Sequence, residues 1–177
     1  GLALHPTLGL SAAPALQRIE LDAEFIHSKA RDGARLWLGT GLQGKVFVLE
    51  AGKVREVAKV EAPMVASLLP DGSGGVYAGL VGNGQVVHIG GDGKVSAVVK
   101  LDANHVWSLA RRGGSLYAGT GPGGKVFAID TGAKTSKLYA ETGADHVLVL
   151  ADGGDALYAG TADQALLLRI DAEKSVR

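Results

Sequence analysis

The segment Leu116-Tyr117-Ala118-Gly119-Thr120 belongs to a pattern that recurs four times in this chain of 177 residues. Each copy places an apolar residue, an aromatic residue and a small or apolar residue before a glycine. The copies are Leu36–Thr40, Val76–Leu80, Leu116–Thr120 and Leu157–Thr161. Their starting positions are 40, 40 and 41 residues apart. A constant period of this length is typical of proteins built from one repeated structural unit.

Further apolar runs keep fixed places around each copy. One run begins ten residues after the start of each copy, at Val46, Val86, Val126 and Leu167. Another precedes each copy, at Ile26, Met64, Val106 and Val147. A fourth run covers Val54–Val60, Val95–Leu101 and Thr135–Glu141. The runs are short, rich in β-branched and aromatic residues, and bounded by Gly, Asp or Asn, which predicts strands joined by tight turns.

The size of the repeat predicts the fold class. Four antiparallel strands within about 40 residues correspond to one propeller blade. Runs such as Val46-Phe47-Val48-Leu49 are apolar on both faces, as expected for a strand that lies between two neighbouring sheets. We therefore predict an all-β fold, namely a β-propeller of four-stranded antiparallel blades with four blade equivalents. The repeated glycines should let neighbouring blades approach closely.

The last repeat lacks an outer strand, and a matching segment lies at the other end of the chain. Residues 16–23 align with residues 96–103, which form the outer strand of the second unit. We therefore predict that the N-terminal strand closes the last blade. The predicted blades are residues 25–60, 64–101, 106–141, and 147–177 plus 15–22. Two alternatives stay open: the chain is part of a larger propeller, or it is half of an eight-bladed dimer.

Residues 1–14 match no part of the repeat, which occupies residues 15–177. This segment contains Pro6, Pro14 and scattered leucines. We expect it to be a strap over the ring, the remnant of a preceding blade or a docking arm.

Two stretches resemble a known family. The runs Leu116–Asp130 and His105–Ala110 are similar to the repeats of bacterial WD-like β-propeller repeat proteins. The resemblance covers residues 15–177 and implies a binding platform, since the fold by itself assigns no activity. The tryptophan-aspartate ending of true WD repeats is missing, so their side-chain network is not carried over.

Composition restricts the partners and the chemistry. Lysine and arginine number 18, as do aspartate and glutamate, so no net charge attracts nucleic acid. The absence of cysteine excludes disulfides and thiolate metal sites. We expect neither membrane insertion nor a signal peptide in this chain, because no apolar run has the necessary length or flanks. The compartment stays open, with cytoplasmic, periplasmic and secreted locations all in agreement with the composition.

Polar and aromatic residues precede the innermost strand of three repeats, where they should ring one face near the central axis. The candidate binding residues are Glu24, Phe25, Asn104, His105, Asp145 and His146. These side chains could bind a peptide, a sugar or a metal, although the simpler interpretation is that they cap turns. A metal normally requires three protein ligands held close together. We therefore predict no metal, no cofactor and no catalytic residue.

The predicted function is a non-catalytic binding or scaffold propeller that presents a loop face to a protein or peptide. The first alternative is a lectin-like module that stacks glycans on the repeated aromatic residues, which are Trp37, Tyr77, Tyr117 and Tyr158. The second is a fragment of a larger propeller, or one half of a homodimeric ring, with no independent function. A metal-dependent hydrolase is the least favoured hypothesis.

Overall fold

The computed structural model of the chain describes residues 2–6, 9–12 and 15–171. These residues form β-strands and their connections, and no helix long and apolar enough to cross a membrane occurs among them. Every pair of adjacent strands runs antiparallel. The prediction of an all-β chain of antiparallel sheets is confirmed.

The strands form four successive meanders, which we call blades 1 to 4. Blade 1 contains β3 (Ile26–Asp32), β4 (Arg35–Thr40), β5 (Lys45–Glu50) and β6 (Lys53–Lys59). Blade 2 contains β7 (Met64–Pro70), β8 (Val76–Val81), β9 (Gln85–Ile89) and β10 (Val95–Lys100). Blade 3 contains β11 (His105–Arg112), β12 (Ser115–Gly121), β13 (Lys125–Asp130) and β14 (Thr135–Glu141). Blade 4 contains β15 (Val147–Asp152), β16 (Leu157–Thr161) and β17 (Leu167–Ile170).

Neighbouring blades pack through a valine that lies on a glycine. A Cβ atom added to Gly119 would lie 2.6 Å from Cγ1 of Val147 and 2.9 Å from its carbonyl oxygen, so no side chain fits there. The same contact occurs at each boundary between blades. The three pairs are Val65 on Gly39, Val106 on Gly79, and Val147 on Gly119. The repeated glycines therefore permit close approach of neighbouring sheets, as their position after an apolar triplet predicted.

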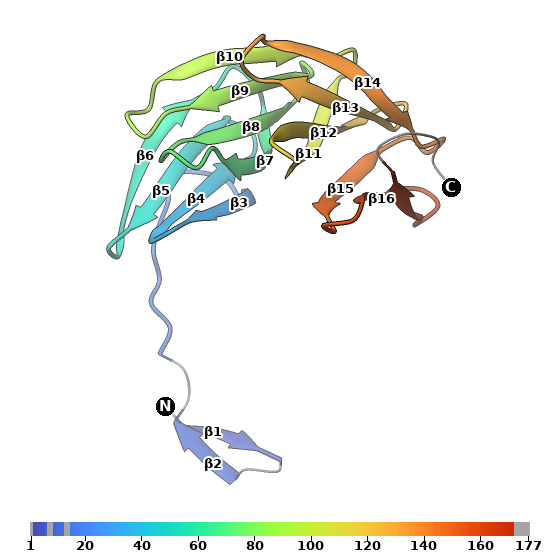
Figure 1. Ribbon diagram of the computed structural model, residues 1–177. Helices are drawn as coiled ribbons and strands as arrows, with labels where there is room; N and C mark the ends of the chain where they lie inside the picture. Colours follow the sequence, from blue (N-terminus) through green and yellow to red (C-terminus); the bar gives the residue numbers. More distant parts are fainter. Residues whose placement is uncertain (1, 7–8, 13–14, 172–177) are drawn as a thin grey trace.

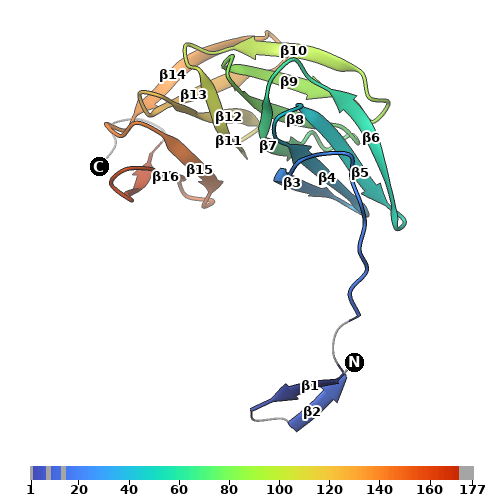
Figure 2. The same ribbon diagram turned by 180° about the vertical axis from the view of Figure 1, so that it is seen from behind.

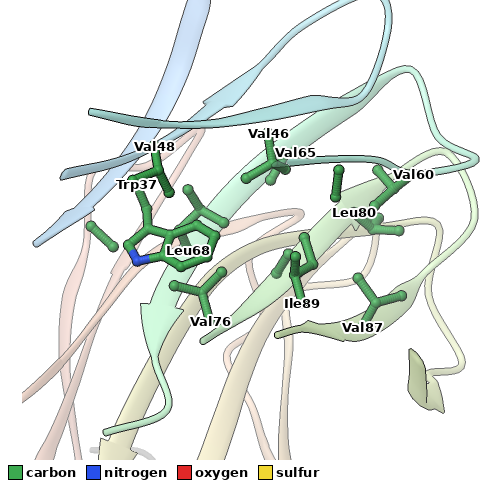
Figure 3. Packing of buried hydrophobic residues seen from close by; sticks show 13 residues of the cluster. Trp37, Val46, Val48, Val60, Val65, Leu68, Val76, Leu80, Val87 and Ile89 are labelled. Carbon is green, nitrogen blue, oxygen red and sulfur yellow. The ribbon is translucent and has the colours of Figure 1, made fainter. Parts of the chain in front are cut away.

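The core lies between the blades. In Figure 3, Trp37 and Val48 of blade 1 face Leu68 and Val76 of blade 2. The Trp37 side chain has no exposed surface, so the largest apolar side chain of blade 1 is completely buried in the contact with blade 2. A strand in this position has apolar residues on both faces, which explains the uninterrupted apolar run of β5.

The blades follow one another in an open arc, with blade 1 and blade 4 at its two ends (Figure 1). Because the same contact recurs at each boundary, each blade is rotated from the last in a similar way. Four blades related by three such steps do not complete a circle (Figure 1).

The expected closure of the last blade by residues 15–22 is not formed. These residues adopt no strand, and β15, β16 and β17 make a sheet of three strands. The side chain of Leu16 is 97% exposed. The physical reason is the curvature, since the open arc keeps the start of blade 1 away from blade 4, and the segment before blade 1 runs away from the arc toward the hairpin (Figure 1). Residues 172–177, which the prediction also assigned to this blade, lie outside the described residues.

The N-terminal segment forms a hairpin. Strand β1 (Leu2–His5) pairs with β2 (Gly9–Ala12), and an extended connection leads from there to blade 1. The hairpin stands apart from the blades in both ribbon views (Figure 2).

The valine-on-glycine contact makes a prediction about stability. Gly119→Ala should lower the free energy of unfolding by about 1–3 kcal/mol, because the new methyl group overlaps Val147 and forces blades 3 and 4 apart. Urea unfolding followed by circular dichroism measures the loss. Gly132→Ala is the control, since its Cβ would have Asp130 Oδ1 at 3.4 Å as its nearest neighbour. Equal stability of the two variants would contradict this role of Gly119.

Candidate binding site at the inner edge of blades 3 and 4

A β-bulge in each innermost strand determines which side chains point inward. In β11 the register with β12 shifts between Val106 and Ser108. Val106 lies on Gly79 of the preceding blade, whereas Ser108 Oγ donates to the carbonyl oxygen of Val147 in the following blade at 3.3 Å. In a regular strand residues two apart share a face. The bulge therefore turns them to opposite neighbours, and Trp107 between them stays partly exposed.

Trp107 joins two histidines into a cluster at the inner edge of the arc. Its Nε1 donates to Nδ1 of His146 at 3.1 Å. The ring centroids of His105 and Trp107 are 5.0 Å apart, and those of Trp107 and His146 are 5.8 Å apart. All three side chains are partly exposed. We call these three residues the inner-edge cluster; it spans blade 3 and blade 4.

The hydrogen bonds define the protonation of the histidines. Nδ1 of His146 accepts from Trp107, and Nδ1 of His105 accepts from the backbone amide of Gly82 at 3.2 Å. A ring nitrogen that accepts carries no proton, so these hydrogen bonds place the proton of each imidazole on Nε2. Burial lowers the pKa of His105, and the neighbouring His146 lowers it further. His105 is therefore uncharged at neutral pH.

The structure brings together only part of the predicted ring of site residues. His105 and His146 meet, with ring centroids 6.4 Å apart. Glu24 and Phe25 lie exposed at the opposite end of the arc, because the arc does not close. Phe25 instead approaches His27 of its own blade, with ring centroids 6.3 Å apart.

Asn104 and Asp145 act at the same turns mainly through their backbones. The Asn104 carbonyl accepts from the amides of Gly82 and Gly84 at 2.9 Å each, and the Asp145 carbonyl accepts from Gly124 at 2.8 Å. Their side chains are exposed. These carbonyl oxygens tie the turn of one blade to the start of the next, so the two residues help to position the histidines that follow them.

Sequence reasoning missed Trp107. The available signal was its position directly after Val106, the first apolar residue of an innermost strand. The equivalent residue of blade 1 is His27, which is also aromatic and polar. In the part of the chain that the structure describes, no three His, Asp or Glu side chains gather as ligands for a metal ion.

Two of the four repeated aromatic residues are buried, whereas Tyr77 and Tyr158 are partly exposed. Trp37 is fully buried and Tyr117 is 9% exposed, so neither presents a face on which a sugar could stack. Tyr117 instead meets Tyr139 edge-on, with ring centroids 4.9 Å apart.

Another histidine, His88, stabilises the turn between β7 and β8 of blade 2. Nε2 of His88 lies 2.7 Å from Oδ2 of Asp71, and the other carboxylate oxygen accepts from the amides of Ser73 and Gly75. Burial alone would raise the pKa of Asp71, but the hydrogen bonds from His88 and the two amides outweigh it and hold the pKa well below its usual range. The pair borders a hollow of about 350 Å³ that also includes Tyr77 and Lys134.

Comparison with solved structures gives the fold. The streptogramin B lyase structure superposes with a TM-score of 0.77 at 15% identity, over 90% of this chain and 55% of that chain. Virginiamycin B lyase from Staphylococcus aureus, in the complex with quinupristin, gives a TM-score of 0.76 at 13% identity, over 91% of this chain and 58% of that chain. These neighbours are propeller-like repeat proteins. The chain has a propeller-type repeat fold.

Two further structures extend this likeness. A chain from the crystal structure of the nidogen/laminin complex gives a TM-score of 0.77 at 11% identity, over 97% of this chain and 69% of that one. The computationally designed Ika4 protein gives 0.69 at 18% identity, over 92% of this chain and 100% of that one. The present chain thus spans a little over half the length of the lyases and the whole length of the designed protein.

Sequence comparison assigns this chain to no family. No protein-family model matches the sequence, and no curated protein matches it. The WD-like resemblance therefore stays a prediction. At these identities the likeness concerns the fold alone, so the activity of the lyases is not transferred.

The Asp71 turn makes a prediction about pH. Because the folded pKa of Asp71 is depressed, its ionised form adds stability that is complete above the ordinary carboxyl pKa of about 4 and is lost as the pH falls through the folded value. Asp71→Asn should lower the free energy of unfolding by about 1–3 kcal/mol at neutral pH. The difference from wild type should shrink below about pH 4.

Urea midpoints of both proteins over a pH series measure this difference. The control is Asp92→Asn, in an exposed turn where the carboxylate accepts from the amide of Lys94 and has no histidine beside it. It should shift the midpoint much less. A constant difference between wild type and Asp71→Asn down to acid pH would contradict the assignment.

Proposed function

We propose that the chain is a non-catalytic binding module, and that the inner-edge cluster holds a protein or peptide partner. The observation that carries this proposal is the hydrogen bond between Trp107 and His146, which joins two blades and leaves the outer part of all three rings in contact with solvent. Strand β11 carries His105 and Trp107, and His146 directly precedes β15, so little conformational freedom is lost on binding.

The chemistry of the cluster indicates what it binds. Trp107 offers a large apolar surface, and tryptophan is enriched among the residues that dominate binding energy at protein interfaces. The two imidazoles keep their Nε2 protons as hydrogen-bond donors. This combination suits an apolar peptide side chain flanked by backbone carbonyl groups, which accept the two hydrogen bonds.

The alternative functions have less support. A glycan-binding propeller would use the repeated aromatic residues, of which Trp37 and Tyr117 are buried. A metal-dependent hydrolase would need a ligand set, and the described residues offer no group of three suitable side chains. A role as one part of a larger propeller agrees with the coverage of the lyases, and it is compatible with a binding site at the inner edge.

A peptide-display library tests the proposal. Peptides selected on the wild-type protein should bind Trp107→Ala about tenfold more weakly or worse, because the substitution removes the apolar surface and the contact with His146. Leu138→Ala is the control, since Leu138 is 48% exposed on the outer strand of the same blade. Selection of peptides that bind wild type and Trp107→Ala equally well would overturn the assigned site.

The lowered pKa of His105 adds a pH dependence. His105 is neutral at pH 7, and its protonation would place a charge beside His146 and disrupt its acceptance from Gly82. Binding of the selected peptides should therefore weaken as the pH falls below the ordinary histidine range, around 6.5. His105→Gln keeps a neutral side chain and should flatten this dependence in titrations by fluorescence anisotropy. A wild-type affinity that is constant across this range would contradict the role of the neutral histidine.

A further inference from the structure

Blade 4 exposes the face that blades 1 to 3 bury against the next blade. The first apolar residue of the third strand is fully buried in those blades, where it is Val46, Val86 or Val126. The equivalent residue of blade 4 is Leu167, which is 75% exposed. Val149, at the position where the other blades have a serine, is also exposed.

Blade 1 exposes the opposite face. The valine that lies on the preceding blade is fully buried in blades 2, 3 and 4, where it is Val65, Val106 or Val147. Its equivalent in blade 1 is Ile26, which is 49% exposed. The two ends of the arc therefore present the two halves of one type of interface.

Gly160 of blade 4 is the vacant half of a valine-on-glycine contact. In blade 1, a Cβ added to Gly39 would meet Cγ1 of Val65 in the next blade at 2.8 Å. At Gly160 the nearest atom is Cβ of Val149, in the same blade, at 3.5 Å. The space before Gly160 is thus open on the side of a following blade, and Ile26 has the matching position at the other end of the arc.

Residues just before blade 1 already make the contact of a preceding outer strand. Lys45 Nζ pairs with Asp22 Oδ2 at 2.6 Å, and Lys125 Nζ pairs with Asp102 Oδ2 at 3.0 Å. Lys125 and Asp102 belong to successive units, since Asp102 follows the outer strand of blade 2. Asp22 therefore lies where a blade in front of blade 1 would end, and the sequence alignment of residues 16–23 with residues 96–103 agrees.

We propose that two copies of this chain associate head to tail into one ring. Ile26 of one copy packs on the partner's Gly160, and residues 15–22 add a fourth strand to the edge of the partner's β17 that no described strand pairs with. Two-fold symmetry then covers both exposed ends of each chain, in a closed assembly with identical interfaces. Each contact repeats one that exists between blades within the chain, which is why a second copy fits these faces.

The closed ring also completes the site at the inner edge. Glu24 and Phe25 precede blade 1 as Asp145 and His146 precede blade 4. In the ring they stand next to the partner's blade 4 and therefore continue the row of residues that the open arc interrupts. The association does not rest on the proposed function, and it is tested without any ligand.

Light scattering coupled to size-exclusion chromatography tests the association of residues 1–177. The wild-type protein should have twice the mass of one chain. Ile26→Lys and Leu167→Lys should each reduce it to one chain with an unchanged far-ultraviolet spectrum, because both residues are exposed in a single copy. Leu138→Lys is the control, with 48% exposure outside both faces, and it should keep the doubled mass. A wild-type mass of one chain, or a doubled mass in the Ile26→Lys variant, would overturn the proposal.

Cysteine cross-linking tests the exchange of strands. The chain has no cysteine, so Ile19→Cys with Leu167→Cys introduces the only two. The alignment places Ile19 at the position of Val99, which pairs with Val86, the equivalent of Leu167. Mild oxidation should yield covalent dimers on non-reducing gels, whereas Leu138→Cys with Leu167→Cys should yield far fewer. Equal yields from the two double variants would overturn the pairing of residues 15–22 with the partner's β17.

Discussion

The structure depends on the close contact between a valine of one blade and a glycine of the blade before it. This contact sets the distance between neighbouring sheets, and its recurrence at each boundary makes the chain a regular array. The buried apolar side chains form clusters between neighbouring blades, as Trp37 does between blades 1 and 2. A single blade would therefore be unstable alone, because both of its faces would be exposed to water.

The same interface places the candidate binding residues. A bulge in the innermost strand lets Val106 face the preceding blade and Ser108 face the following one. The residue between them is Trp107, which contacts His105 and His146 at the inner edge. The equivalent residue of blade 2 is Ala66, which is buried, whereas Trp107 in blade 3 extends a large ring toward His146. The same register shift occurs in the innermost strand of each blade, and the residue at this position differs from blade to blade.

Sequence reasoning succeeded where a property is local and periodic. The spacing of Gly39, Gly79 and Gly119 after apolar triplets sufficed to predict strands and tight packing between sheets. The repeat pattern could not predict whether residues 15–22 close the last blade. Closure depends on the curvature of the arc, which arises from small rotations that accumulate over several interfaces. Within one chain the predicted ring of site residues is formed only in part for the same reason, since Phe25 and His146 are neighbours only if the two ends meet. Trp107 was missed because a bulge depends on strand pairing, which the pattern of residue types does not display.

Val149 removes a hydrogen bond from the contact that blade 4 can make with a following blade. In blades 1 and 3 the equivalent serine hydroxyl donates to a carbonyl of the next blade, at 2.8 Å for Ser28 and 3.3 Å for Ser108. A valine can contribute only apolar contact to whatever covers it. Any surface that packs on blade 4 is therefore held without this directional bond and can slide or detach more readily than an internal boundary. Under a pulling force, the array should part at this boundary before any boundary that a serine bridges.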